Sequence, residues 1–234
     1  MKEPEVIFCD NHVLVAVKPP NMPSQADESG DLDMFSAMKA YVKEKYQKPG
    51  EVYLGLLHRL DRPVGGLMAF ARTSKAASRL SEQLRTHAMY REYLAVVQGT
   101  ITGEGEFFDY LLQDGNKVRT VGEGTDGAKQ ARLHYRVLGT CEGLSLAHIR
   151  LETGRKHQIR VQFASHGLPL WGDARYGGGH PGEQIALWGV RLMFTHPTRH
   201  EEQVFFSAPS CQYPWSLFTN EINTFKTLAG ETSC

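Results

Sequence analysis

The sequence predicts an α+β fold, with a mixed, mostly antiparallel sheet and flanking helices. Many short apolar segments are separated by Gly, Asn and Asp turn residues, and only a few stretches have helical spacing. The 234 residues, 41% of them apolar, can bury a substantial core. We find no internal repeat and no linker rich in Gly, Ser or Pro, so we expect a single domain over residues 1–234.

The N-terminal part is expected to begin with two short strands, residues 6–8 and 13–17, joined by a turn. A loop rich in proline follows. Asp33 is then a candidate N-cap for a helix that ends near residue 46. The side chains at helical spacing that should face inward are Phe35, Met38, Tyr41 and Val42.

The middle of the chain predicts a strand, a tight turn and a second strand within residues 53–70. Thr73 or Ser74 should cap a helix that ends near residue 87. Residues 90–98 alternate as a strand, with Tyr93, Ala95 and Val97 on one face.

The second half contains an irregular excursion and then regular elements. Residues 104–127 are dense in turn signals around a short strand at 118–121, which predicts a hairpin excursion. The remaining predictions are strands at 130–138 and 144–152, a helix at 156–165, a hairpin at 186–195 and 203–208, and a short helix after Pro214.

The composition narrows the class of protein. The acidic start lacks the apolar segment of a signal peptide, and no apolar run approaches the roughly 20 residues of a membrane span. Cys9, Cys141, Cys211 and Cys234 are far apart and form no C-x-x-C pair, which favours reduced thiols. We therefore expect a cytoplasmic protein with no membrane partner.

One stretch, Leu57 to Gly66, places a single carboxylate among groups that are or can be cationic. Asp61 is flanked by His58, Arg59 and Arg62, between two apolar runs. Opposite charges within about 4–6 Å keep a carboxylate ionised. An ionised Asp in this setting can serve as a nucleophile, a base or a counter-ion. Pro63 fixes φ at the expected turn, and Gly65 and Gly66 allow a positive φ or a close backbone approach.

Three blocks occur in a fixed order: HRLD at 58–61, YLAVVQG at 93–99 and GRKHQIRV at 154–161. Together they resemble the motifs of the RluA-type RNA pseudouridine synthases, over about residues 6–209. The chain departs from the family at three positions, none of which removes a charge from the site. Val64, Gly65 and Gln162 stand where the family commonly has Thr, Ser and His.

The resemblance implies the pseudouridine synthase fold, in which a sheet bends around a central cleft that holds the catalytic Asp. Some relatives carry a small N-terminal S4 domain that binds RNA. This chain begins at the catalytic core, and we expect it to lack that domain.

The resemblance also implies the site. Asp61 matches the catalytic carboxylate, Arg160 the arginine that pairs with it, and Tyr93 the active-site tyrosine. The reaction isomerises a flipped-out uridine of rRNA or tRNA to pseudouridine without redox chemistry. Asp173 is expected to be structural.

Formal net charge is zero, but basic residues cluster. Residues 58–92 hold seven Lys or Arg against three acids, and residues 150–175 hold five against two. Such segments can bind phosphates locally, although solvated faces are the alternative interpretation. The candidate RNA-binding residues are Arg59, Arg62, Lys75, Arg79, Arg155, Lys156 and His157.

No cofactor is expected, because the sequence lacks a P-loop, a dinucleotide fingerprint and a cysteine zinc site. His196 and His200 have a spacing of four, but Pro197 argues against a helical metal site, and we predict no metal. RNA is the expected partner, with no obligate protein partner. Two other functions stay open: a non-catalytic RNA-binding module, and a hydrolase of free nucleosides.

Overall fold

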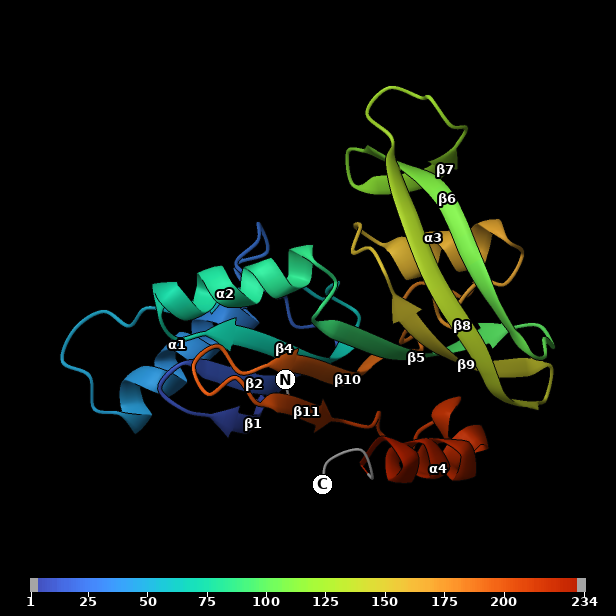
Figure 1. The fold of residues 1–234 in the computed structure, drawn as a ribbon. Helices are drawn as coiled ribbons and strands as arrows, with labels where there is room; N and C mark the ends of the chain where they lie inside the picture. The colour runs from blue at the N-terminus through green and yellow to red at the C-terminus, as the bar shows by residue number, and fades with distance from the viewer. Residues whose placement is uncertain (1–3, 231–234) are drawn as a thin grey trace. The chain divides into compact units, whose positions relative to one another are not determined.

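The computed structural model describes residues 4–230 (Figure 1). The chain divides into two compact units. The first unit contains the described residues up to Tyr90 together with Gly189–Ser207, and the second contains Arg91–Trp188 and the described residues from Ala208 onward. Both combine helices with antiparallel strand pairs, so the predicted α+β class is confirmed. The single catalytic domain stays a prediction.

The sheet of the first unit has the strand order β1-β2-β4-β10, with β11 paired to β10 and β3 paired to β4. Its strands are β1 (Glu5–Cys9), β2 (Val13–Lys18), β3 (Gly55–Leu56), β4 (Gly65–Ala71), β10 (Leu187–Thr195) and β11 (Glu202–Phe206). β2 and β4 are antiparallel, in a register that places Lys18 opposite Gly66.

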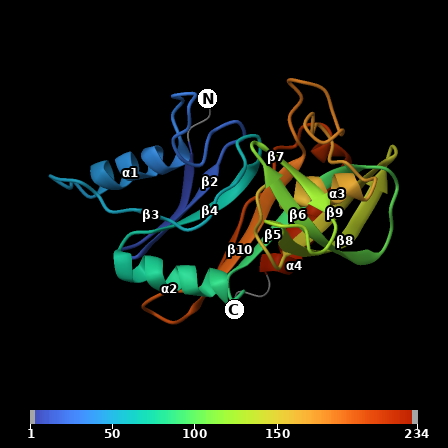
Figure 2. The same cartoon turned by 90° about the horizontal axis from the view of Figure 1, so that it is seen from above.

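Helices α1 (Met34–Lys45) and α2 (Ser74–Arg85) lie on opposite sides of β2 and β4 (Figure 2). Both N-caps were predicted correctly. The side chain of Asp33 accepts from the Ser36 N–H at 3.0 Å, and that of Thr73 accepts from the Ala76 N–H at 3.1 Å.

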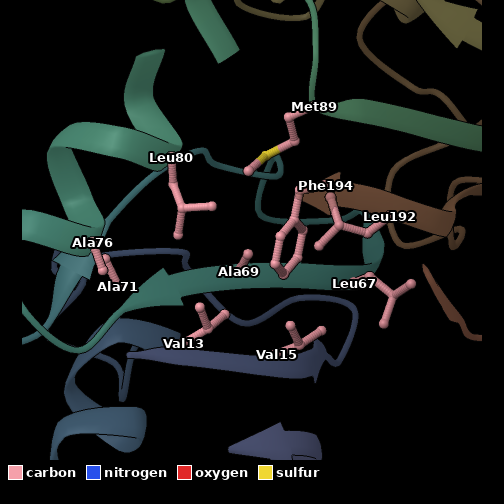
Figure 3. Close-up of a cluster of buried hydrophobic side chains, with 10 residues drawn as sticks. All are labelled: Val13, Val15, Leu67, Ala69, Ala71, Ala76, Leu80, Met89, Leu192 and Phe194. Carbon is pink, nitrogen blue, oxygen red and sulfur yellow. The ribbon is translucent and has the colours of Figure 1, made fainter. Parts of the chain in front are cut away.

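The alternation of β2 and β4 divides their side chains between two faces. One face packs with α2 in a continuous apolar cluster (Figure 3). The buried residues of this cluster are Val13, Val15, Leu67, Ala69, Ala71, Ala76, Leu80, Met89, Leu192 and Phe194. In α1, the side chains of Met34, Met38 and Val42 are buried. The predicted inward residues Phe35 and Tyr41 are only half-buried.

Gly66 is required by a close backbone approach. Its φ of +128° lies in a region that L side chains rarely adopt. A Cβ there would lie 2.3 Å from the backbone N of Gly189 in β10. Gly65 and Gly66 begin β4, and the positive φ and close backbone approach that the sequence allowed are confirmed at Gly66.

The second unit has the strand order β5-β9-β8-β6-β7, and each neighbouring pair in this order is antiparallel. Its strands are β5 (Tyr90–Gln98), β6 (Glu104–Asp114), β7 (Lys117–Val121), β8 (Lys129–Cys141) and β9 (Leu144–Leu151). Helix α3 (Gln158–Ser165) contacts β6 and β7 (Figure 1). A 3₁₀ turn η1 (Trp215–Phe218) leads into α4 (Thr219–Gly230).

The predicted hairpin excursion is confirmed, and its first strand, β6, has 11 residues, with Phe107 and Leu111 buried. Three other predicted elements differ from the structure. The strand before Asp61 is reduced to β3, and the tail holds a 12-residue helix, α4. Helix α3 begins later than predicted because His157 has a left-handed backbone with φ 54°.

Within the described part of the chain, no helix combines the length and apolar character needed to cross a membrane. Cys9, Cys141 and Cys211 are free thiols. Cys234 and the first three residues of the predicted acidic start lie outside the described residues.

Candidate active site

Asp61 lies in the connection between β3 and β4 and is half-buried. A turn begins at this residue, because the Val64 N–H donates to the Asp61 carbonyl at 2.9 Å. The neighbouring side chains of Leu60 and Val64 are buried. The backbone on each side of the carboxylate is therefore packed into the first unit.

Ser24 fixes the residue before Asp61. Its hydroxyl donates to the Leu60 carbonyl at 2.6 Å and accepts from the Leu60 N–H at 3.1 Å. The backbone N–H and carbonyl of the buried Leu60 are thus both hydrogen-bonded to one side chain from the loop after β2. The pair fixes the orientation of the peptide that leads into Asp61.

Lys18 fixes the residue after Asp61. The β2–β4 register brings this fully buried lysine to the start of β4. Its ammonium donates to the carbonyls of Pro19 at 3.0 Å, Met22 at 2.6 Å and Arg62 at 3.0 Å. These bonds use all three donors of the ammonium. Lys18 thereby ties the proline-rich loop after β2 to the turn that carries Asp61.

Lys18 is also a positive charge that interacts with Asp61. The pKa of Lys18 is lowered from 10.5 to about 7: burial is the largest cause, the negative charge of Asp61 raises the pKa, and the positive charge of Arg62 lowers it. Sequence reasoning missed both Lys18 and Ser24. The available signal was a lysine that ends an apolar strand on the same face as Leu14 and Ala16.

His58 has a structural role, which corrects its interpretation as a group able to become cationic beside Asp61. Its ring is buried, and Nε2 accepts from the Ala69 N–H of β4 at 3.1 Å. A nitrogen that accepts carries no proton, so this bond requires the neutral ring. His58 therefore connects the Asp61 loop to β4.

The two arginines beside Asp61 have different environments. Arg59 is exposed. Arg62 is also exposed, and its guanidinium forms ion pairs with Asp27 and Asp31. Farther along the first unit, Lys75 is exposed on α2, whereas Arg79 donates to the Pro197 carbonyl.

The second unit contains the other predicted catalytic residues. Tyr93 is buried in β5, where it pairs with Ile149 of β9. Arg160 of α3 is buried and binds Asp173 bidentately, with Nε and Nη2 each 2.8 Å from a carboxylate oxygen. The structure thus gives Asp173 the structural role that we expected. The pairing of Arg160 with Asp61 stays a prediction.

Tyr176, which follows the third family block in the sequence, lies beside Arg160. The guanidinium carbon of Arg160 lies 5.2 Å from the ring centroid of Tyr176. The Tyr176 hydroxyl is 2.8 Å from His157 Nδ1 and accepts from the Val118 N–H at 3.2 Å. His157 thus connects to this cluster, while the predicted RNA contacts Arg155 and Lys156 are exposed.

His196, which was considered as a metal ligand, has other partners. His196 Nε2 lies 2.8 Å from a carboxylate oxygen of Asp10, and its Nδ1 accepts from the Arg199 N–H at 3.1 Å. Among the residues that the structure describes, no three His, Cys, Asp or Glu side chains gather in a way that could hold a metal ion.

Residues 12–165 match the family model described as RNA pseudouridylate synthase. The chain belongs to this family, and the predicted membership is confirmed.

Curated relatives are similar in sequence over most of the chain. An uncharacterized RNA pseudouridine synthase of Bacillus subtilis (strain 168) is 34% identical over 204 residues, covering 85% of this chain and 66% of that protein. Ribosomal large subunit pseudouridine synthase D of Zymomonas mobilis is 32% identical, and the match covers 92% of this chain and 71% of that protein. The protein of that name from Pseudomonas aeruginosa is 35% identical, and the match covers 75% of this chain and 54% of that protein. The chain thus spans between 54% and 71% of these relatives' lengths.

Two solved structures share the fold. Human RNA pseudouridylate synthase domain containing 4 superposes with a TM-score of 0.74 at 20% identity, covering 95% of this chain and 93% of that one. Human RNA pseudouridylate synthase domain containing 1 superposes with a TM-score of 0.68 at 21% identity, covering 91% and 85%. These structures confirm the predicted pseudouridine synthase fold.

The buried Lys18 predicts a specific dependence of stability on pH. Its pKa is lowered from 10.5 to about 7, so between these values the unfolded chain binds a proton that the folded chain does not. The free energy of unfolding of the wild type relative to Lys18→Met should therefore rise as pH increases from about 7 to 9. Urea unfolding of both proteins across this range measures the difference. Lys75→Met, at an exposed lysine, is the control and should give a constant difference. A constant difference for Lys18→Met would contradict the assignment.

Proposed function

We propose that this protein is an RNA pseudouridine synthase and that Asp61 is its catalytic carboxylate. The observation that carries the proposal is the support of the Asp61 loop. Ser24 binds Leu60 immediately before the carboxylate, and Lys18 binds Arg62 immediately after it. A half-buried carboxylate between two fixed peptides is preorganised. A catalytic group needs this property because it must be held in the correct position relative to the reacting atom of the substrate. This loop lies within the segment that matches the family.

The proposed reaction breaks the C1′–N1 bond of uridine, turns the base and rejoins it through C5. The atoms are rearranged within one nucleotide, so the reaction needs no oxidant or reductant. Asp61 would stabilise or capture the electron-poor anomeric carbon, as a carboxylate does in a retaining glycosidase. The base must leave its stack to reach a loop carboxylate, so we propose that it is flipped out.

Tyr93 and Arg160 complete the proposed set, on the basis of the family motifs. Tyr93 would stack on the flipped uracil, and its hydroxyl would take part in the proton movement that accompanies rearrangement. Arg160 would support the ionised carboxylate. Asp173 already holds its guanidinium in a bidentate pair, which restricts the directions of its remaining donors.

We propose that the target uridine lies in the RNA of the large ribosomal subunit, with tRNA as the alternative. Two of the relatives described above are named ribosomal large subunit pseudouridine synthase D. Mapping pseudouridines in rRNA and tRNA from cells with and without the protein tests this choice. A lost modification in tRNA alone would contradict it.

Asp61→Asn should abolish turnover while the protein still folds and binds RNA. The change keeps the size of the side chain and removes its charge. Loss of covalent catalysis should cost several kcal/mol of barrier, so we expect less than about a thousandth of wild-type turnover in a single-turnover assay.

Asp126→Asn is the matched control for this change, because Asp126 is an exposed carboxylate in the turn region after β7. It should retain wild-type turnover. An Asp61→Asn protein that keeps more than about a thousandth of the activity would refute the assigned role.

Two substitutions at Tyr93 separate stacking from proton transfer. Tyr93→Phe keeps the ring and should bind RNA almost normally but react about 10²–10⁴-fold more slowly, as expected for a lost acid–base group. Tyr93→Leu should lose binding of the flipped state as well, because stacking contributes about 1–3 kcal/mol per base. Single-turnover rates and RNA affinities of both variants measure this. Full activity of Tyr93→Phe would leave only stacking, and full activity of Tyr93→Leu would make Tyr93 a core residue.

A further inference from the structure

The side chain of Arg62 is held by an acidic segment of the same unit, residues 27–31. Arg62 Nη1 lies 3.3 Å from a carboxylate oxygen of Asp27 and donates to the Ser29 hydroxyl at 2.9 Å. Arg62 Nη2 donates to a carboxylate oxygen of Asp31. Two carboxylates and one hydroxyl thus surround a single guanidinium. Because Arg62 directly follows Asp61, this contact bears on how RNA binds beside the candidate catalytic carboxylate.

The acidic segment is preorganised for this contact by its own hydrogen bonds. The Ser29 N–H and hydroxyl donate to one carboxylate oxygen of Asp27 at 2.9 and 2.5 Å. The Asp31 N–H donates to the Ser29 hydroxyl at 3.2 Å. Gly30, with φ +70°, turns the chain so that both carboxylates meet the same guanidinium.

The two ends of Arg62 are held with different strength. Its carbonyl accepts from the fully buried Lys18, which fixes the backbone. Its side chain is 40% exposed, and those of Asp27 and Asp31 are 42% and 39% exposed. Ion pairs exposed to this degree stabilise a protein little and exchange readily. The side chain can therefore change partner while the Asp61 loop stays in place.

A phosphate is a suitable replacement partner. A guanidinium presents parallel donors that match a phosphate bidentately, whereas here each carboxylate binds a different nitrogen of Arg62. An RNA that approaches Arg62 also meets the two negative charges of Asp27 and Asp31.

We propose that residues 27–31 form an acidic strap that occupies Arg62 in the RNA-free protein and is displaced when an RNA phosphate binds Arg62. The proposal rests on the proposed function, since it assumes an RNA substrate. The strap acts as a competitor built into the chain. An RNA whose phosphate binds Arg62 must first displace the strap, so the strap weakens that binding.

The test compares two single substitutions that each remove one negative charge from the same segment. Asp31→Asn removes a carboxylate that pairs with Arg62. Glu28→Gln removes an exposed carboxylate of the same segment that is not one of the two ion-pair partners of Arg62. Affinity for a short single-stranded RNA of mixed sequence is measured over a range of salt concentrations. We expect Asp31→Asn to bind about two- to fivefold more tightly than the wild type, the range of an exposed ion pair, and Glu28→Gln to bind distinctly less tightly than Asp31→Asn.

A second pair of variants tests whether the tighter RNA binding of Asp31→Asn depends on Arg62. Arg62→Gln should weaken binding and lower the slope of log affinity against log salt by about 0.7, the value for one phosphate contact on a single strand. Adding Asp31→Asn to Arg62→Gln should then change affinity no more than Glu28→Gln does.

The results separate failure of the strap from failure of the proposed function. The strap is overturned if Asp31→Asn and Glu28→Gln behave alike, or if the gain from Asp31→Asn persists in the Arg62→Gln background. In either case a wild type that binds RNA and forms pseudouridine leaves the proposed function intact. A wild type with no salt-dependent RNA affinity overturns both.

Discussion

The buried ammonium of Lys18 is the interaction on which the arrangement around Asp61 depends. A charge this deeply buried is costly unless it is fully hydrogen-bonded and near an opposite charge. Here three carbonyls accept from the ammonium and the charge of Asp61 offsets part of the cost of burial, which still lowers the pKa of Lys18 to about 7. The acceptors lie in two loops that are far apart in the sequence, so satisfying one ammonium brings those loops together. The position of the candidate catalytic carboxylate follows from this requirement.

The same loop combines a fixed backbone with an exchangeable side chain. Ser24 and Lys18 hold the peptides on either side of Asp61, whereas the guanidinium of Arg62 pairs with exposed carboxylates. A site that must bind a long polyanion and then place one carbon atom accurately needs both properties. In the second unit, the bidentate pair of Arg160 with Asp173 provides similar rigidity.

Local signals were predicted well from the sequence, and long-range contacts were not. The caps Asp33 and Thr73 depend on residues three positions away, and both were found. The bonds from Ser24 to Leu60 and from Lys18 to Arg62 span 36 and 44 residues and leave no local pattern. The sequence allowed a positive φ or a close backbone approach at Gly66, but only the structure shows that β10 is the neighbour that requires a glycine there. The motifs identified Asp61, but its supporting residues became visible only in the structure.

The most direct test of this account removes the support of Asp61 without touching the carboxylate. Ser24→Ala deletes both hydrogen bonds to Leu60 and leaves two buried polar groups without that partner, at a cost of about 1–3 kcal/mol. Single-turnover pseudouridine formation is measured well below the melting temperature, with Ser81→Ala on the exposed face of α2 as the control. The account predicts a rate lower by roughly tenfold at unchanged RNA affinity, because about 1.4 kcal/mol of barrier changes a rate tenfold. A folded Ser24→Ala protein with the wild-type rate would contradict it.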